Sequence, residues 1–282
     1  MKLAFSTNAF KRTTLADALE TIARIGYSGA EVLADRPHAY PADLADGDVL
    51  RIKNLLAENS LEVSNVNAFT FFAEGDTYHP SWIEPEEALR ERRVGLTEGA
   101  IDLAARLGAG NLSTEPGGPL PEGMSRREGL DIFAEGLGRC ADAARARGVK
   151  ILVEPEPGLL IETSGQIEEF LDRIDHPSVG LNCDLGHFFC VGEDPAGVVR
   201  RFAGRIGHVH LEDIASDRRH YHLVPGAGAM DIEGILSALD ETGYDGFVTV
   251  ELYPYEETPA EVAGRAYDYL AEIFPGPRGS AR

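Results

Sequence analysis

The chain has 282 residues, of which 43 % are hydrophobic, so it can build a large core and is not a disordered protein. Acidic residues outnumber basic ones by 47 to 26, and the net charge of −21 argues against a nucleic-acid partner because it repels phosphate backbones. No apolar run approaches the roughly 20 residues of a membrane span, and three cysteines without a CxxC pair are typical of a reducing compartment, so we expect a cytoplasmic protein with no membrane partner.

Short apolar runs alternate with amphipathic segments along the chain. The first amphipathic segment has Thr14 near its start and Gly26 just past its last apolar residue, which is typical of a helix. Strands are predicted at 2–7, 29–34, 61–69, 110–115, 149–157, 179–184, 206–213 and 247–252. Helices are predicted at 14–26, 47–60, 86–107, 124–147, 164–174, 194–203, 231–242 and 258–273. An irregular stretch at 70–85 carries Tyr78, His79 and Trp82, which could form a lid.

Eight strands, each followed by a helical segment, indicate the α/β class with parallel pairing, because parallel strands need crossover connections. The count and the length predict a single (β/α)8 TIM barrel over residues 1–274, followed by a loose C-terminal tail at 275–282. An open doubly wound sheet is the alternative, but no GxGxxG follows the first strand. Arg90, Arg92 and Arg93 are expected on the solvated face of their helix.

The active site of such a barrel lies at the C-terminal ends of its strands. The last four strands bring Glu154, Asp184, the His208 and His210 pair, and Glu251 to those ends. Three clustered carboxylates would repel one another, and a divalent cation removes that conflict. Oxygen ligands with one imidazole favour Mn²⁺, Mg²⁺ or Co²⁺ over Zn²⁺ or Fe²⁺. Taken singly, however, an acid at a strand end is commonly a helix cap, and a strand histidine is commonly a core residue.

Four motifs in the second half carry a resemblance to a known family. VEPEPG (153–158), LNCDLGH (181–187), HVHLED with VPGAGAMD (208–231) and GYDGFVTVELY (243–253) together resemble the sugar phosphate isomerase/epimerase family. This family belongs to the xylose isomerase-like TIM barrel superfamily, whose members include D-tagatose 3-epimerase, hydroxypyruvate isomerase and inosose dehydratase. The ordered set of motifs is specific for the superfamily and does not specify the substrate.

The resemblance implies a divalent ion held by Glu154, Asp184, His210 and Glu251, with Mn²⁺ expected first and Mg²⁺, Co²⁺ or Zn²⁺ as alternatives. It places His187, three residues after the aspartate, in the substrate site. His208 is expected one layer deeper in the barrel, where it would support the ligand His210.

Substrate-binding residues are expected in the loops above the barrel. Members of the family commonly use an arginine after the ligand histidine, and the matching loop DRRHYH offers Arg219 and His222, beside Arg218 and His220. Asn67 and Glu156, near the ends of the third and fifth strands, are further candidates. So are Asn8, His38 and Glu115, because polar groups at strand ends could bind sugar hydroxyls.

The implied chemistry is proton removal beside a carbonyl of a small carbohydrate or cyclitol, giving an enediolate. Glu154 and Glu251 would act as base and acid on opposite faces in an epimerase, whereas a single base would give aldose–ketose isomerisation. A lyase on the same barrel, such as an inosose dehydratase or a C-glycoside-cleaving enzyme, is the alternative, with His187, His220 or His222 as the acid.

Two other functions, an abasic-site endonuclease and a binding protein, agree less well with the sequence. An abasic-site endonuclease would need many more histidines in the first half, which offers only His38 and His79. A binding protein without turnover would be expected to lack one of the four ligands, and all four positions are filled. The resemblance further suggests a homodimer or a homotetramer.

Overall fold

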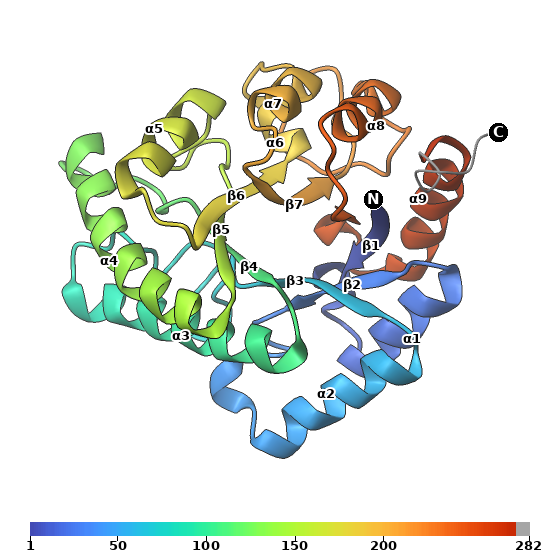
Figure 1. The fold of residues 1–282 in the computed structure, drawn as a ribbon, viewed down its shortest axis with the longest axis horizontal. Helices are drawn as coiled ribbons and strands as arrows, with labels where there is room; N and C mark the ends of the chain where they lie inside the picture. The colour runs from blue at the N-terminus through green and yellow to red at the C-terminus, as the bar shows by residue number, and fades with distance from the viewer. Residues whose placement is uncertain (275–282) are drawn as a thin grey trace.

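The computed structural model describes residues 1–274, which form a closed barrel of eight parallel strands with helices on its outside (Figure 1). The strands pair in chain order, and the last strand pairs with the first to close the barrel. The strands are β1 (Lys2–Ser6), β2 (Gly29–Leu33), β3 (Glu62–Asn67), β4 (Asn111–Thr114), β5 (Lys150–Val153), β6 (Val179–Asp184), β7 (Ile206–Leu211) and β8 (Phe247–Val250). The predicted (β/α)8 barrel is confirmed, and the predicted tail at 275–282 lies outside the described residues.

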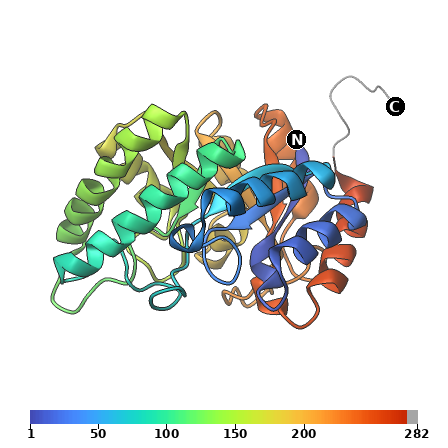
Figure 2. The ribbon, with the colours of Figure 1, turned by 90° about the horizontal axis from the view of Figure 1, so that it is seen from below.

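Helices connect successive strands around the barrel. They are α1 (Leu15–Ile25), α2 (Asp46–Glu58), α3 (Glu87–Leu107), α4 (Arg126–Arg147), α5 (Ser164–Ile174), α6 (Leu185–Cys190), α7 (Pro195–Arg201), α8 (Ile232–Glu241) and α9 (Pro259–Ile273). Short 3-10 turns lie at η1 (Thr7–Phe10), η2 (Pro41–Asp43) and η3 (Tyr253–Tyr255). The long α3 and α4 lie side by side on one flank (Figures 1 and 2), and α9 packs against α1 to complete the ring.

Local sequence signals set the helix ends. The Thr14 side chain accepts a hydrogen bond from the Asp17 amide at the start of α1, and Gly26, with φ of 121°, ends that helix. Ser125 and Glu128 form a reciprocal capping box at the start of α4. Because these signals are short-range, the predicted helices lie close to the observed ones.

The structure departs from the predicted elements after β5 and β6. The fifth strand ends at Val153 rather than at residue 157, so Glu154 and Glu156 leave the sheet and enter the loop above it. The helix α6, which begins directly after Asp184, was not expected from the sequence. The Asp184 carboxylate accepts a hydrogen bond from the His187 amide at 2.8 Å, so the DLGH motif is also a helix cap.

Arg93 corrects the expectation that the arginines of α3 are solvated. Its side chain is fully buried, and its guanidinium donates hydrogen bonds to the carbonyl oxygens of Pro80 at 2.8 Å and Phe69 at 2.9 Å. Arg92, its neighbour, is exposed as predicted. The buried guanidinium of Arg93 thus supplies donors to carbonyl groups of the irregular segment 68–80, which would otherwise be buried without partners.

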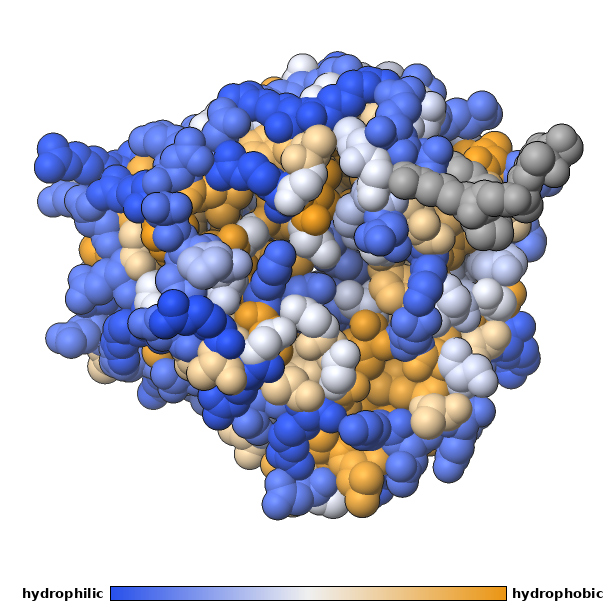
Figure 3. Space-filling model, viewed as in Figure 1, coloured by the Kyte–Doolittle hydropathy of each residue, from blue (hydrophilic) through white to orange (hydrophobic). Residues whose placement is uncertain are grey.

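The face of the molecule that looks along the shortest axis carries mostly polar side chains (Figure 3). On the face shown in Figure 3, hydrophilic residues dominate and hydrophobic ones appear in patches between them. Among residues 1–274, no helix combines the length and the apolar character that crossing a bilayer requires.

Candidate metal and substrate site

Four side chains from neighbouring strands converge at the C-terminal end of the barrel. Glu154 follows β5, Asp184 ends β6, His210 lies in β7 and Glu251 follows β8. One ligand atom from each lies within 4.8 Å of the other three, and all four side chains are buried. The structure therefore brings together the four residues that the resemblance implied as metal ligands.

The His210 ring lies between carboxylates on both sides. Its Nδ1 lies 3.0 Å from Oε1 of Glu154, and its Nε2 lies 2.7 Å from Oε2 of Glu31. Burial disfavours the charged imidazolium, but the carboxylates of Glu31, Glu154 and Glu251 outweigh it and raise the pKa of His210 well above its ordinary value. This cluster of acids therefore stabilises a positive charge at its centre.

The donor set fits a divalent metal ion. Burial raises the pKa of Asp184 and of Glu251, because each charged carboxylate has lost its water, and neither forms an ion pair with any lysine or arginine of residues 1–274. The buried Oδ2 of Asp184 has no hydrogen-bond partner within the same residues. A divalent ion would neutralise the carboxylates and give that oxygen a ligand bond, and three carboxylates with one imidazole suit such an ion.

Glu31 is a site residue that was not expected from the sequence. It lies in the middle of β2, is fully buried, and accepts hydrogen bonds from Ser6 Oγ at 2.6 Å and Asn65 Nδ2 at 2.7 Å. Although burial opposes ionisation, the histidines His210 and His208 hold the pKa of Glu31 well below its ordinary range. The available signal was a glutamate inside the otherwise apolar run GAEVLA.

Amide side chains orient the two glutamates of the donor set. Asn182 donates to Oε2 of Glu154 at 2.7 Å, while Asn8 donates to Oε1 of Glu251 at 2.8 Å. Asn182 was also missed, and its signal was its position two residues before Asp184, which places both side chains on the same face of β6. His208 lies one layer below the ligands, with its Nε2 3.5 Å from Oε2 of Glu31.

A cavity of about 330 Å³ opens above the four residues. Glu154 and Glu251 form part of its wall, and so do Asn67, Glu156 and His187, three of the predicted substrate-binding residues. The remaining lining residues are Asn8, Lys11, Leu33, Phe69, Thr70, Phe72, Thr77, Tyr78, His220 and Tyr253. The cavity wall combines carboxylates, amides and aromatic rings, a combination that suits a small polar ligand.

Arg219 and His222 do not reach the cavity wall. The Arg219 side chain is 85 % exposed and pairs with Asp217 at 3.3 Å, so it points into solvent. His222 is fully buried, with its Nδ1 2.9 Å from the carbonyl oxygen of Glu251. His220 lines the cavity in their place.

Glu156 and Tyr78 form a hydrogen-bonded pair in the cavity wall. The Tyr78 hydroxyl donates to Oε1 of Glu156 at 2.6 Å, and burial raises the pKa of Glu156 to about 8. Of the aromatic residues considered for a lid, Tyr78 alone fits that role. Trp82 is part of the core, where its ring packs on Phe133 and its Nε1 donates to Thr114 Oγ1 at 3.0 Å.

Two further candidates from the first half lie outside the cavity. His38 has its Nε2 3.2 Å from the carbonyl oxygen of Phe10, and Glu115 accepts a hydrogen bond from the Trp82 amide at 3.1 Å. Both are buried loop residues, so they support the chain around the site without lining it.

Comparisons with known proteins agree with this fold. A family model described as "Xylose isomerase-like TIM barrel" matches residues 19–273. The chain is 28 % identical over 283 residues to an inosose dehydratase of Clostridium beijerinckii, covering 93 % of this chain and 90 % of that protein. A crystal structure of the IOLI protein with a bound zinc atom has a TM-score of 0.79 at 22 % identity, with 97 % of this chain and 99 % of that one covered. A D-tagatose 3-epimerase-like protein has a TM-score of 0.77 at 23 % identity, with 96 % and 99 % covered.

Proposed function

The chain belongs to the xylose isomerase-like TIM barrel family, and from this premise we propose that it is a divalent-metal-dependent isomerase or epimerase of a sugar, keto-sugar or cyclitol. The observation that carries the proposal is the buried set of Glu154, Asp184, His210 and Glu251 at the floor of a cavity of about 330 Å³. Two of the four, both glutamates, are also exposed to the cavity, so they can contact a bound substrate.

Proton transfer is assigned to Glu154 and Glu251. They come from β5 and β8, which are separated by two strands of the ring, so they approach a ligand in the cavity from different sides. One glutamate removes the proton beside the carbonyl and the other returns a proton on the opposite face, which gives epimerisation. If a single glutamate removes the proton from one carbon and returns it to the neighbouring carbon, the result is aldose–ketose isomerisation.

The surrounding residues position this chemistry. Asn182 fixes the carboxylate of Glu154, while Asn8 and Asn67 both donate to Oε1 of Glu251, so each base is held in one orientation. A divalent ion bound by the four residues would polarise the substrate carbonyl and offset the charge that develops on its oxygen. Asn67, Glu156 and His187 are the groups assigned to substrate hydroxyls, because all three line the cavity.

Mn²⁺ is the ion that we propose for this site. Three of the four ligands are carboxylates, and oxygen-rich sets favour Mn²⁺ or Mg²⁺, while the imidazole shifts the preference toward Mn²⁺. A cytoplasmic location is part of the same proposal, and the three free thiols of Cys140, Cys183 and Cys190 suit it. The homodimer or homotetramer remains a prediction from the family.

A dehydratase is the second candidate, favoured by the likeness to proteins named inosose dehydratase. Elimination begins with the same proton removal but also needs an acid near the leaving hydroxyl. The hydrogen-bonded Glu156 and Tyr78 pair and the ring of His220 lie in the cavity wall and are the groups available for that role.

Incubation of the Mn²⁺-loaded protein with ketoses and cyclitol ketones in D₂O, followed by NMR, tests the proposal. An epimer or isomer that carries deuterium beside the carbonyl supports an isomerase, and a product that has lost water supports the dehydratase. Glu154→Gln and Glu251→Gln should each lower the exchange rate by about 10²- to 10⁴-fold. Glu62→Gln is the matched control, since Glu62 is an exposed glutamate that pairs with Lys2 far from the site. Absence of exchange on the whole panel would contradict both candidates.

A further inference from the structure

We propose that Asp35 is a positioning residue, which fixes one wall of the cavity and thereby sets the affinity for the substrate. Asp35 lies two residues past the end of β2, and its side chain is fully buried. The wall that it fixes is the stretch of chain at 69–78, between β3 and α3, which we call the wall segment. The proposal rests on the proposed function, because that function assigns the cavity to the substrate.

The wall segment supplies a large part of the cavity lining. Five of the residues that line the cavity belong to it, namely Phe69, Thr70, Phe72, Thr77 and Tyr78. The segment contains neither helix nor strand, so no regular ladder of backbone hydrogen bonds determines its path. Its backbone N–H groups therefore depend on other acceptors, and those acceptors determine where the lining side chains point.

The Asp35 carboxylate is the main acceptor for the first half of the wall segment. Its Oδ2 accepts hydrogen bonds from the Thr70 hydroxyl at 2.8 Å and from the Phe72 amide at 2.6 Å. Its Oδ1 accepts one from the Ala73 amide at 2.9 Å. Within residues 1–274, neither amide donates to any other group. Hydrogen bonds to a carboxylate are shorter and stronger than those to a neutral acceptor, so this carboxylate fixes the turn at 70–73.

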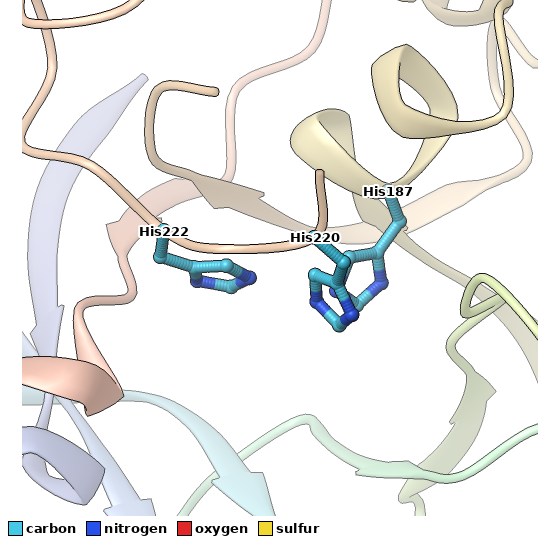
Figure 4. A group of neighbouring side chains, drawn as sticks. All are labelled: His187, His220 and His222. Atoms are coloured by element: carbon cyan, nitrogen blue, oxygen red, sulfur yellow. The ribbon is translucent and has the colours of Figure 1, made fainter. Parts of the chain in front are cut away.

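A second contact holds the far end of the wall segment. The Tyr78 hydroxyl donates to Oε1 of Glu156, and that oxygen lies 3.7 Å from Nδ1 of His220. Figure 4 shows the ring of His220 close to that of His187, and both rings also line the cavity. Asp35 follows β2 and Glu156 follows β5, two strands that β3 and β4 separate in the ring. The wall segment is therefore held near both ends, by loops from different parts of the barrel.

This arrangement assigns Asp35 to binding and not to proton transfer. Within residues 1–274 its side chain forms hydrogen bonds only with Arg36, Thr70, Phe72 and Ala73. None of these four is a proposed metal ligand or a proposed base. A wall that is already ordered spares the substrate the free-energy cost of ordering it on binding. Because that benefit is the same for the bound substrate and for the transition state, its loss raises KM and leaves kcat unchanged.

Asp35→Asn tests the proposal with two measurements on the full-length protein. The substitution keeps the size of the side chain but replaces one acceptor oxygen with a donor that faces N–H groups. Hydrogen–deuterium exchange followed by mass spectrometry should become faster in residues 69–80 and stay unchanged in β6. With the ketone that the unaltered protein turns over fastest, we expect KM to rise about tenfold and kcat to stay within about twofold. The affinity for Mn²⁺, measured by calorimetric titration, should not change.

Asp213→Asn is the matched control. Asp213 is also buried, and its carboxylate accepts hydrogen bonds from the amides of Gly226 at 3.0 Å, Gly228 at 2.8 Å and Met230 at 3.0 Å. None of those three residues lines the cavity. This variant should lose a similar amount of stability while KM stays the same. An equal rise of KM in both variants would overturn the proposal, because it would reflect a general loosening of the protein.

The two measurements separate this proposal from the proposed function. Unchanged exchange in residues 69–80 of Asp35→Asn would overturn the proposal, whatever the activity. A lower kcat at constant KM would also overturn it, because Asp35 would then act on the chemical step. If Asp35→Asn does not fold, Thr70→Val removes one donor to the same carboxylate, and faster exchange of residues 69–80 in that variant decides the question. If the unaltered protein turns over no ketone, the proposed function fails, and the exchange measurement still decides whether Asp35 holds the wall segment.

Discussion

Glu31 holds His210 from the side opposite the other acids, with Oε2 of Glu31 2.7 Å from Nε2 of His210. The two residues are 179 positions apart in the chain, and their strands, β2 and β7, are separated in the ring by β1 and β8, so the contact runs through the barrel interior. With Nε2 donating to Glu31, the lone pair of the neutral ring lies on Nδ1, which points at Glu154, Asp184 and Glu251.

Replacing Glu31 tests this arrangement. Glu31→Gln keeps the shape but removes the charge that fixes the ring, so the affinity for Mn²⁺ should fall by about 10- to 100-fold. Calorimetric titration of the metal-free protein measures the effect. Glu62→Gln, at the exposed start of β3, is the control and should bind Mn²⁺ like the unaltered protein. Unchanged affinity in Glu31→Gln would show that Glu31 does not position the ligand.

Metal removal should lower the thermal stability. The carboxylates of Glu154, Asp184 and Glu251 repel one another in a buried site, and an ion that binds only the folded state stabilises it by about 2.7 kcal/mol at 100 times its dissociation constant. For a chain of this size we expect the melting temperature to rise by about 5–10 °C on adding Mn²⁺. Differential scanning calorimetry measures the shift. Asp184→Asn should weaken the response, and an equal response in that variant would place the ion elsewhere.

Arg93 should be essential for stability rather than for activity. Arg93→Met leaves the carbonyl groups of Phe69 and Pro80 buried without their donor, so we expect a loss of about 3–5 kcal/mol in the free energy of unfolding. Urea unfolding followed by circular dichroism provides the measurement. Arg92→Met is the matched control one residue earlier on α3, where the side chain is 55 % exposed, and should change stability by less than about 0.5 kcal/mol. Similar losses in both variants would argue against the buried hydrogen bonds as the cause.

Glu115 should make the stability depend on pH. Burial raises its pKa to about 7 from an ordinary value of 4.5, although Arg93 nearby opposes the shift. Between these two values the unfolded chain releases the proton while the folded protein keeps it. The free energy of unfolding therefore falls as the pH rises through this window, by about 3 kcal/mol at most, and is level above it.

Glu115→Gln should remove this contribution. Urea unfolding at several pH values between 4 and 8, compared between the variant and the unaltered protein, isolates it from the other buried acids. The difference in stability should grow in favour of the variant as the pH rises from 4.5 to 7. A constant difference across that range would show that Glu115 titrates as an exposed glutamate does.

The barrel and the four converging residues could be predicted because their signals are local. Apolar periodicity and capping residues such as Thr14 define the elements, and strand ends mark where Glu154, Asp184, His210 and Glu251 meet. The limits of the fifth strand and the helix α6 were not predictable in the same way. The start of α6 depends on the hydrogen bond from the His187 amide to the Asp184 side chain, and the chain after the fifth strand turns to pair the Glu156 amide with the carbonyl oxygen of Ile161. A periodicity pattern contains neither contact.

The loop after β7 shows most clearly which features of the site could not be predicted from the sequence. From its sequence we predicted Arg219 and His222 as substrate-binding residues, beside Arg218 and His220. In the structure Arg219 points into solvent, His222 is buried and His220 lines the cavity. The sequence alone determined the fold and the residues that stand at the strand ends, because both follow from periodicities of a few residues. Only the tertiary structure decided the direction of each loop side chain and the role of Glu31. Those depend on contacts between residues far apart in the chain, which form only when the barrel closes.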